Sequence, residues 1–238
     1  MWIVIECLFR QTYKVDRIVL WLDKGVQYEE LPKSLKQQIE RGLEVRFVED
    51  LRAHTKYYYA LQEFKKDIVI TVDDDCYYPL DTIANLININ KEFPRSIAAN
   101  RIHGIVFDKK NKIVPYSDWK HNFKPQKNDP NLHLLTGVSG VLYPSEIFNE
   151  TLFEKEVLLD ICKYADDIWI SMHAILNEVQ IKTNTKFNKD FISISKSSRV
   201  RLLNHNSKNG GNDDQLKSVL KHLQMDPLIK FVNNKQNI

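Results

Sequence analysis

The sequence is poor in cysteine and glycine and has no long hydrophobic run. Its three cysteines, Cys7, Cys76 and Cys162, are far apart and lack the spacing of metal ligands, and an odd, sparse count is typical of a reducing compartment. No apolar run approaches the ~20 residues that a membrane-spanning helix needs. The opening residues 1–9 are too short for a signal peptide and lack its basic flank. These absences predict a cytoplasmic protein.

The sequence also lacks a strong excess of charge of either sign. It carries 34 basic and 31 acidic side chains, a net charge of +3, which does not favour a nucleic-acid partner. Hydrophobic residues make up 43% of the 238 residues, enough to bury one sizeable core. We therefore expect a single domain over residues 1–238 that does not bind nucleic acid.

Helical and strand-like segments alternate along the first hundred residues. Segments with helical periodicity are followed by short runs rich in β-branched residues. Because such alternation is typical of a parallel sheet covered by helices, we expect an α/β fold with a mostly parallel sheet. The expected helices cover 2–10, 32–41, 56–64 and the segment after Asp81, and the expected strands cover 18–22, 45–48, 68–72 and 97–100.

The pattern changes after Arg101. Residues 101–133 are polar and irregular, and the glycine-containing run Leu134–Pro144 follows them. Gly137 and Gly140 within a predicted strand indicate a bulge or a close approach of the backbone to a ligand. An amphipathic helix near the C-terminal end is expected to pack on the domain, with contact to lipid as the alternative.

Three consecutive aspartates, Asp73, Asp74 and Asp75, follow the predicted strand Ile68–Val72. Ligands of open α/β sheets bind at the carboxyl ends of the strands, and adjacent carboxylates repel one another unless a cation or a proton relieves them. Oxygen ligands of this kind suit Mg²⁺ or Mn²⁺. Since side chains alternate along a strand, Asp73 and Asp75 are expected to face the same way. The alternative is a solvated acidic turn.

A second acidic pair, Asp166 and Asp167, opens a predicted helix. Acidic residues stabilise that end of any helix, which is the plainer explanation. The functional alternative makes one of the two carboxylates a general base. Tyr116 and Trp119 are candidates to stack on a sugar ring, although a packed aromatic is the simpler role.

The remaining candidates are basic. His205 is a lone histidine in a polar stretch, either a surface residue or a ligand of an Mn²⁺-like ion. Lys56, Arg199 and Arg201 could meet phosphate oxygens, arginine through its planar fork and lysine as a point charge. The alternative for each of these three is a solvated surface position.

Taken together, the motifs resemble a bacterial glycosyltransferase of the GT-A fold, in the family-2-like group. The resemblance extends over residues 11–215 and rests on four segments in the family's order. Thr71–Asp75 is similar to the DXD motif. The other three are Gln11–Leu22, similar to the first helix-to-strand passage, Leu135–Pro144, similar to the acceptor-side strand, and Ala165–Trp169, similar to the acidic pair of the acceptor helix.

The resemblance implies a Rossmann-like sheet with a nucleotide-sugar-binding half (1–101), an acceptor-binding half (102–215) and a C-terminal helix and tail (216–238). It implies that Asp73, Asp75 and His205 hold Mn²⁺ or Mg²⁺, and that Asp167, with Asp166 as the second candidate, deprotonates the acceptor. The donor would be a nucleotide sugar. The residues expected to contact it are Lys56, Asp73, Asp74, Arg199 and Arg201.

The expected reaction is metal-dependent transfer of a sugar from a nucleotide-sugar donor to a glycan or lipid-linked acceptor, in synthesis of cell-envelope polysaccharide. A base on one side and the leaving group on the other predict inversion at the anomeric carbon. The expected location is the cytoplasm, and a lipid-linked acceptor would place the protein peripherally at the inner face of the plasma membrane.

The sequence departs from the family at its start, where a strand normally precedes the first helix. Residues 2–10 are predicted to be helical instead. The absence of that strand predicts an exposed apolar sheet edge and self-association. It also keeps open a catalytically weak or inactive binding module. A nucleotidyltransferase is a further alternative, since it too uses carboxylate-held metal, although no Gly-rich Walker loop occurs.

Overall fold

The computed structural model describes residues 1–110, 112–125, 132–184, 186, 191–194 and 211–224. Helices and strands alternate in its first half, as predicted, and their bounds lie within about two residues of the expected ones. The elements are α1 (Trp2–Phe9), β1 (Ile18–Asp23), α2 (Lys33–Glu40), β2 (Leu43–Val48), α3 (Thr55–Glu63), β3 (Val69–Thr71), β4 (Cys76–Tyr77), α4 (Thr82–Glu92) and β5 (Ile97–Ala99).

The second half carries short strands and three helices. Asp166 and Asp167 open a helix, as predicted. The elements are β6 (Ile102–Gly104), β7 (His133–Leu135), β8 (Val141–Tyr143), α5 (Lys155–Ile161), α6 (Asp166–Leu176), β9 (Ile181–Lys182), β10 (Ile192–Ser193) and α7 (Gly211–His222).

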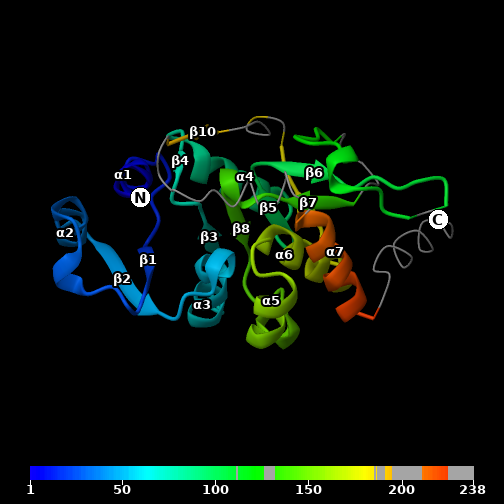
Figure 1. The fold of residues 1–238 in the computed structure, drawn as a ribbon. Helices are drawn as coiled ribbons and strands as arrows, with labels where there is room; N and C mark the ends of the chain where they lie inside the picture. The colour runs from blue at the N-terminus through cyan, green and yellow to red at the C-terminus, as the bar shows by residue number, and fades with distance from the viewer. Residues whose placement is uncertain (111, 126–131, 185, 187–190, 195–210, 225–238) are drawn as a thin grey trace.

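The fold is α/β, as predicted, but its sheets are small and mixed rather than mostly parallel. The largest sheet has the order β3-β8-β5-β9, in which β8 runs antiparallel to both neighbours and β5 runs parallel to β9. Separate two-stranded pairs are formed by β1 with β2, β4 with β10, and β6 with β7. Figure 1 shows the β1–β2 pair at one end of the molecule and the four-stranded sheet near its middle.

The prediction of a mostly parallel sheet was wrong because the chain returns antiparallel after β6, so that β7 and β8 run opposite to β6 and β5. The run expected to be one strand is divided into β7 and β8 by a 3₁₀ turn, Gly137–Ser139, followed by Gly140. Gly140 has φ 89°, a backbone conformation that glycine adopts without steric cost. β7 and β8 run in the same direction: β7 pairs antiparallel with β6, and β8 continues that ladder antiparallel to β5 and also pairs with β3, so the turn is the bulge that the two glycines indicated.

The main hydrophobic core lies between the four-stranded sheet and helices α3, α5, α6 and α7 (Figure 1). Trp169 of α6 is fully buried there and donates its indole N–H to the Leu152 carbonyl oxygen at 2.9 Å. Leu216 and Val219 of α7 belong to the same core. The final helix therefore packs on the domain, as predicted.

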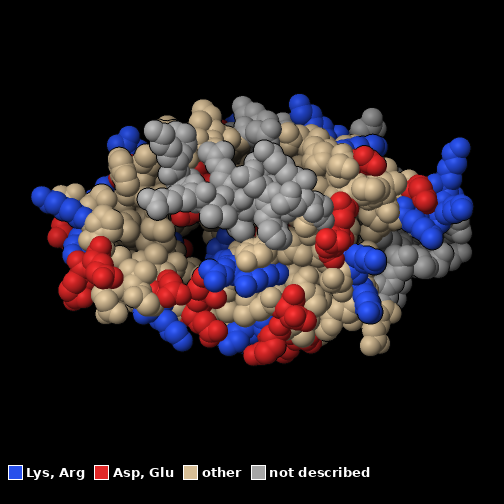
Figure 2. All heavy atoms as spheres, in the orientation of Figure 1, with Lys and Arg blue, Asp and Glu red and all other residues tan. Residues whose placement is uncertain are grey.

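Charges of both signs are distributed over the surface. Figure 2 shows acidic and basic side chains intermixed on the visible face. Within the described ranges, no helix combines the length and apolar character needed to cross a bilayer. All three cysteines are buried free thiols.

Candidate functional site

Two predicted site residues, Asp73 and Asp166, contact the ammonium group of a third, Lys56. Its Nζ atom lies 2.6 Å from Asp73 Oδ1, just beyond β3, and 2.9 Å from Asp166 Oδ2, at the start of α6. The side chains of Lys56 and Asp73 are 24% and 28% exposed, so a ligand can reach them, whereas that of Asp166 is only 10% exposed. Residues far apart in the sequence thus form one charged cluster, which we call the Lys56 cluster and define as Lys56, Asp73, Asp166 and Asp167.

Asp167 joins the cluster through the turn that precedes β8. The backbone N–H of Gly137 donates a hydrogen bond to Asp167 Oδ1 at 2.9 Å. A Cβ atom on Gly137 would lie 2.7 Å from Lys56 Nζ and 3.2 Å from Asp167 Oδ1. The glycine predicted to allow a close approach of the backbone therefore does so, although its contacts here are side chains of the chain itself.

A buried tyrosine fixes the backbone at Asp73. The Tyr78 hydroxyl accepts a hydrogen bond from the Asp73 backbone N–H at 2.9 Å and donates one to the Val138 carbonyl oxygen at 3.0 Å. Tyr78 is only 1% exposed, and it ties the end of β3 to the Gly137–Ser139 turn. The sequence analysis missed this residue, because nothing in its local pattern distinguishes it from an ordinary packed aromatic.

The first turn of α3 is linked to the segment that precedes α6. His54 is fully buried and lies 2.7 Å from the Cys162 carbonyl oxygen through Nε2 and 2.9 Å from the Tyr57 hydroxyl through Nδ1. A carbonyl oxygen can only accept, so Nε2 carries the proton and Nδ1 accepts from Tyr57. Burial lowers the pKa of His54, which favours this neutral form. The elements that carry Lys56 and Asp166 are thereby held together.

Electrostatics separates the roles of the cluster's members. Burial raises the pKa of Asp167, and repulsion from Asp166 and Asp73 raises it further, against the opposing effects of Lys56 and the Gly137 hydrogen bond. Burial alone would lower the pKa of Lys56, but the charges of Asp166, Asp73 and Asp167 outweigh it and hold that pKa well above its usual value. The cluster therefore contains a stable ammonium group and one unusually basic carboxylate.

The second and third aspartates of the triplet do not follow the predicted strand alternation. β3 ends at Thr71, and Asp74 and Asp75 lie in a turn before β4. Asp74 is exposed, and Asp75 Oδ1 accepts a contact from the Cys76 thiol at 3.5 Å. The expectation that Asp73 and Asp75 share one face of a strand was wrong, because the extended backbone stops before them.

Three predicted residues, His205, Arg199 and Arg201, lie outside the described part of the chain. The described residues do not by themselves fit the predicted Mn²⁺ or Mg²⁺ site. Within the described residues, no group of three His, Cys, Asp or Glu side chains is arranged to hold an ion. Of the two described ligands, Asp73 already contacts the ammonium of Lys56.

The two aromatic candidates differ in exposure. Trp119 is 4% exposed and donates its indole N–H to the Val114 carbonyl oxygen at 2.9 Å, so it is a packed core residue. Tyr116 is half-buried beside His121, with ring centroids 5.3 Å apart. Its backbone N–H donates to Asp213 Oδ1 at 2.7 Å, which joins this region to the start of α7.

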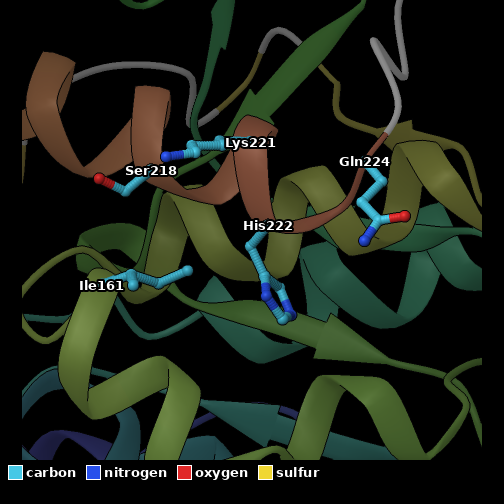
Figure 3. Close-up of a pocket in the computed structure, with 5 residues that line it drawn as sticks. All are labelled: Ile161, Ser218, Lys221, His222 and Gln224. Carbon is cyan, nitrogen blue, oxygen red and sulfur yellow. The ribbon is translucent and has the colours of Figure 1, made fainter.

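A separate hollow of about 390 Å³ lies between the end of α5 and α7. In Figure 3, the His222 side chain extends away from α7. Its Nε2 atom lies 3.1 Å from Oε2 of Glu154, the residue before α5. None of the predicted site residues lines this hollow, and no acidic pair or glycine turn borders it. Its lining residues are Ile161, Ser218, Lys221, His222 and Gln224.

Comparison of the chain with models of known protein families, and with curated proteins, finds no match.

Proposed function

We propose that the chain is an inverting glycosyltransferase that moves a sugar from a nucleotide-sugar donor to a hydroxyl group of a glycan or lipid-linked acceptor. The observation that supports this proposal is the meeting of Asp73, Asp166 and Asp167 around Lys56. The acidic triplet and the acidic pair were expected to serve donor and acceptor, and a transfer reaction needs both at one place.

The proposed chemistry assigns a separate task to each side of the Lys56 cluster. The acceptor oxygen attacks the anomeric carbon, and its proton passes to Asp167. The bond between the anomeric carbon and the phosphate oxygen breaks, and its electron pair leaves with the nucleoside diphosphate. A carboxylate with a raised pKa is a better proton acceptor near neutral pH than an ordinary one, which favours Asp167 as the base.

The wider setting is part of the proposal. We place the donor on the side of Asp73 and the acceptor on the side of α6, in a GT-A-like arrangement. Synthesis of cell-envelope polysaccharide, in the cytoplasm or at the inner face of the plasma membrane, would supply such an acceptor. A divalent ion with His205 as a ligand was the predicted source of positive charge, and Arg199 and Arg201 the predicted phosphate contacts.

A donor screen tests the proposal. The purified chain is incubated with a panel of nucleotide sugars, with and without Mn²⁺ and with mixed sugar acceptors, and the release of nucleoside diphosphate is measured. Release from one donor class, with a product of inverted anomeric configuration by NMR, is the expected result. Release of pyrophosphate would indicate a nucleotidyltransferase instead. A retained configuration would remove Asp167 from its role as the base.

A further inference from the structure

Lys56 lies where an ion bridging the two acidic motifs would lie. Its ammonium group contacts Asp73 on one side and Asp166 on the other, at 2.6 and 2.9 Å. A bound divalent cation would attract the same two carboxylates and reduce the repulsion between them in the same way. The described part of the chain thus already holds one positive charge between the end of β3 and the start of α6.

The position of this ammonium group is built into the fold. A Cβ atom on Gly137 would lie 2.7 Å from Lys56 Nζ, so any larger residue there would displace the end of the lysine side chain from its present position. Lys56 lies on the first turn of α3, between His54 and Tyr57, both fully buried. The hydrogen bond from His54 to Cys162 then ties this turn to the segment before Asp166. A flexible surface lysine would have none of these restraints.

The donor capacity of Lys56 leaves room for a ligand. An ammonium group has three N–H donors; one of them donates a hydrogen bond to Asp73 Oδ1, and Asp166 Oδ2 lies at ion-pair distance without accepting a hydrogen bond within the described residues. The side chain is 24% exposed. A further donor can therefore point to an oxygen of a bound anion while the hydrogen bond to Asp73 and the ion pair with Asp166 hold the lysine in place.

We infer that Lys56 is a catalytic residue that takes the place predicted for the metal ion and contacts the leaving diphosphate directly. The inference rests on the proposed function and adds to it that transfer proceeds without a divalent cation. As the bond between the anomeric carbon and the phosphate oxygen breaks, the diphosphate gains negative charge. The fixed ammonium of Lys56 stabilises that charge and keeps its proton throughout.

The first test uses the unmodified chain. Nucleoside diphosphate release is measured from the nucleotide-sugar panel after treatment with EDTA, and again with added Mn²⁺ or Mg²⁺. Binding of uridine, guanosine, cytidine and thymidine diphosphates is measured by calorimetry under the same two conditions. We expect release and diphosphate affinity to agree within about twofold with and without metal. Activity that is lost in EDTA and restored by Mn²⁺ would overturn the inference and leave the proposed function intact.

Substitutions provide the second test. Lys56→Met should lower kcat/KM about 100-fold or more in EDTA, and Lys56→Arg should retain part of the activity. Lys66→Met is the matched control, because Lys66 is an exposed lysine beyond the end of α3, and it should behave as the unmodified chain. Circular dichroism melting checks that each variant folds. A folded Lys56→Met with unchanged kcat/KM would also overturn the inference. No release from any donor in any condition would instead reject the proposed function.

Discussion

The Gly137 backbone N–H donates a hydrogen bond to Asp167 Oδ1 at 2.9 Å, and this contact holds the carboxylate in the Lys56 cluster. The same glycine leaves space for the ammonium of Lys56. One residue of a turn therefore controls both the proposed base and the positive charge beside it. Any change that moves the turn should disturb both groups together, which makes Gly137 the most direct test of the arrangement.

Gly137→Ala should impair activity much more than stability. The added methyl group would approach Lys56 Nζ to 2.7 Å, so the end of the lysine side chain must move. We expect kcat/KM to fall about 10- to 100-fold, because small misplacements of reacting groups cost rates of this order. Gly25→Ala is a matched control: its methyl group would come equally close, at 2.8 Å, to the flexible carboxylate of Asp23. Equal activity in the two variants would contradict the prediction.

Asp167→Asn should abolish most of the turnover while leaving donor binding intact. The amide cannot accept the acceptor's proton, and removing a general base lowers rates by about 10²- to 10⁴-fold. Steady-state kinetics and calorimetry with nucleoside diphosphates separate the two effects. Asp166→Asn is the comparison, because Asp166 contacts Lys56 directly and its loss should weaken diphosphate binding as well. Should Asp166→Asn alone eliminate turnover, the two assignments exchange.

The raised pKa of Asp167 predicts how stability depends on pH. A carboxyl group whose pKa is raised on folding contributes stability that is fully present below its unfolded-state pKa, about 4. That stability is lost as the pH rises through the folded-state value. Asparagine does not ionise, so Asp167→Asn should become more stable relative to the unmodified chain as the pH is raised from about 4.

Urea unfolding at a series of pH values measures this difference. We expect the gap between the two free energies of unfolding to widen by more than about 1 kcal/mol, since a tenfold change in proton affinity corresponds to about 1.4 kcal/mol. The same raised pKa predicts that kcat/KM increases with pH in the neutral range, because the base must be ionised to act. A difference in the free energy of unfolding that stays constant with pH would mean that folding does not raise the pKa of Asp167.

Local patterns predicted the elements well but not their pairing. The helix from Asp166 and the strand before Asp73 follow from acidic residues in a first helical turn and from a β-branched run, which are local patterns. The direction of β8 depends instead on the return of the chain between β6 and β7 and on two strands distant in sequence. Hydrophobic periodicity contains no information about how the chain returns between β6 and β7, so a mostly parallel sheet was expected.

In the candidate site, too, local features could be predicted from the sequence and long-range contacts could not. The sequence identified Asp73, Asp166, Asp167 and Lys56 as separate candidates, since each belongs to a local acidic or basic pattern. It could not indicate that Lys56 contacts both acidic motifs, because that contact depends on how α3 packs between β3 and α6. The alternation that placed Asp75 beside Asp73 failed because the strand ends two residues before Asp73.

The free edge of β3 predicts that the protein associates with itself. Among the described strands, β3 is hydrogen-bonded to β8 alone, and β1 to β2 alone. Ile68, directly before β3, is 49% exposed. An unpaired edge beside an exposed apolar side chain favours pairing with a second copy, and a charged residue at such an edge opposes it. Ile68→Lys should therefore shift the sedimentation profile toward monomer, whereas Leu80→Lys, at a leucine that is 55% exposed and lies outside the strands, should leave it unchanged. A monomeric unmodified chain at about 100 μM would argue that this edge is protected in another way, because transient complexes of exposed edges are expected at such concentrations.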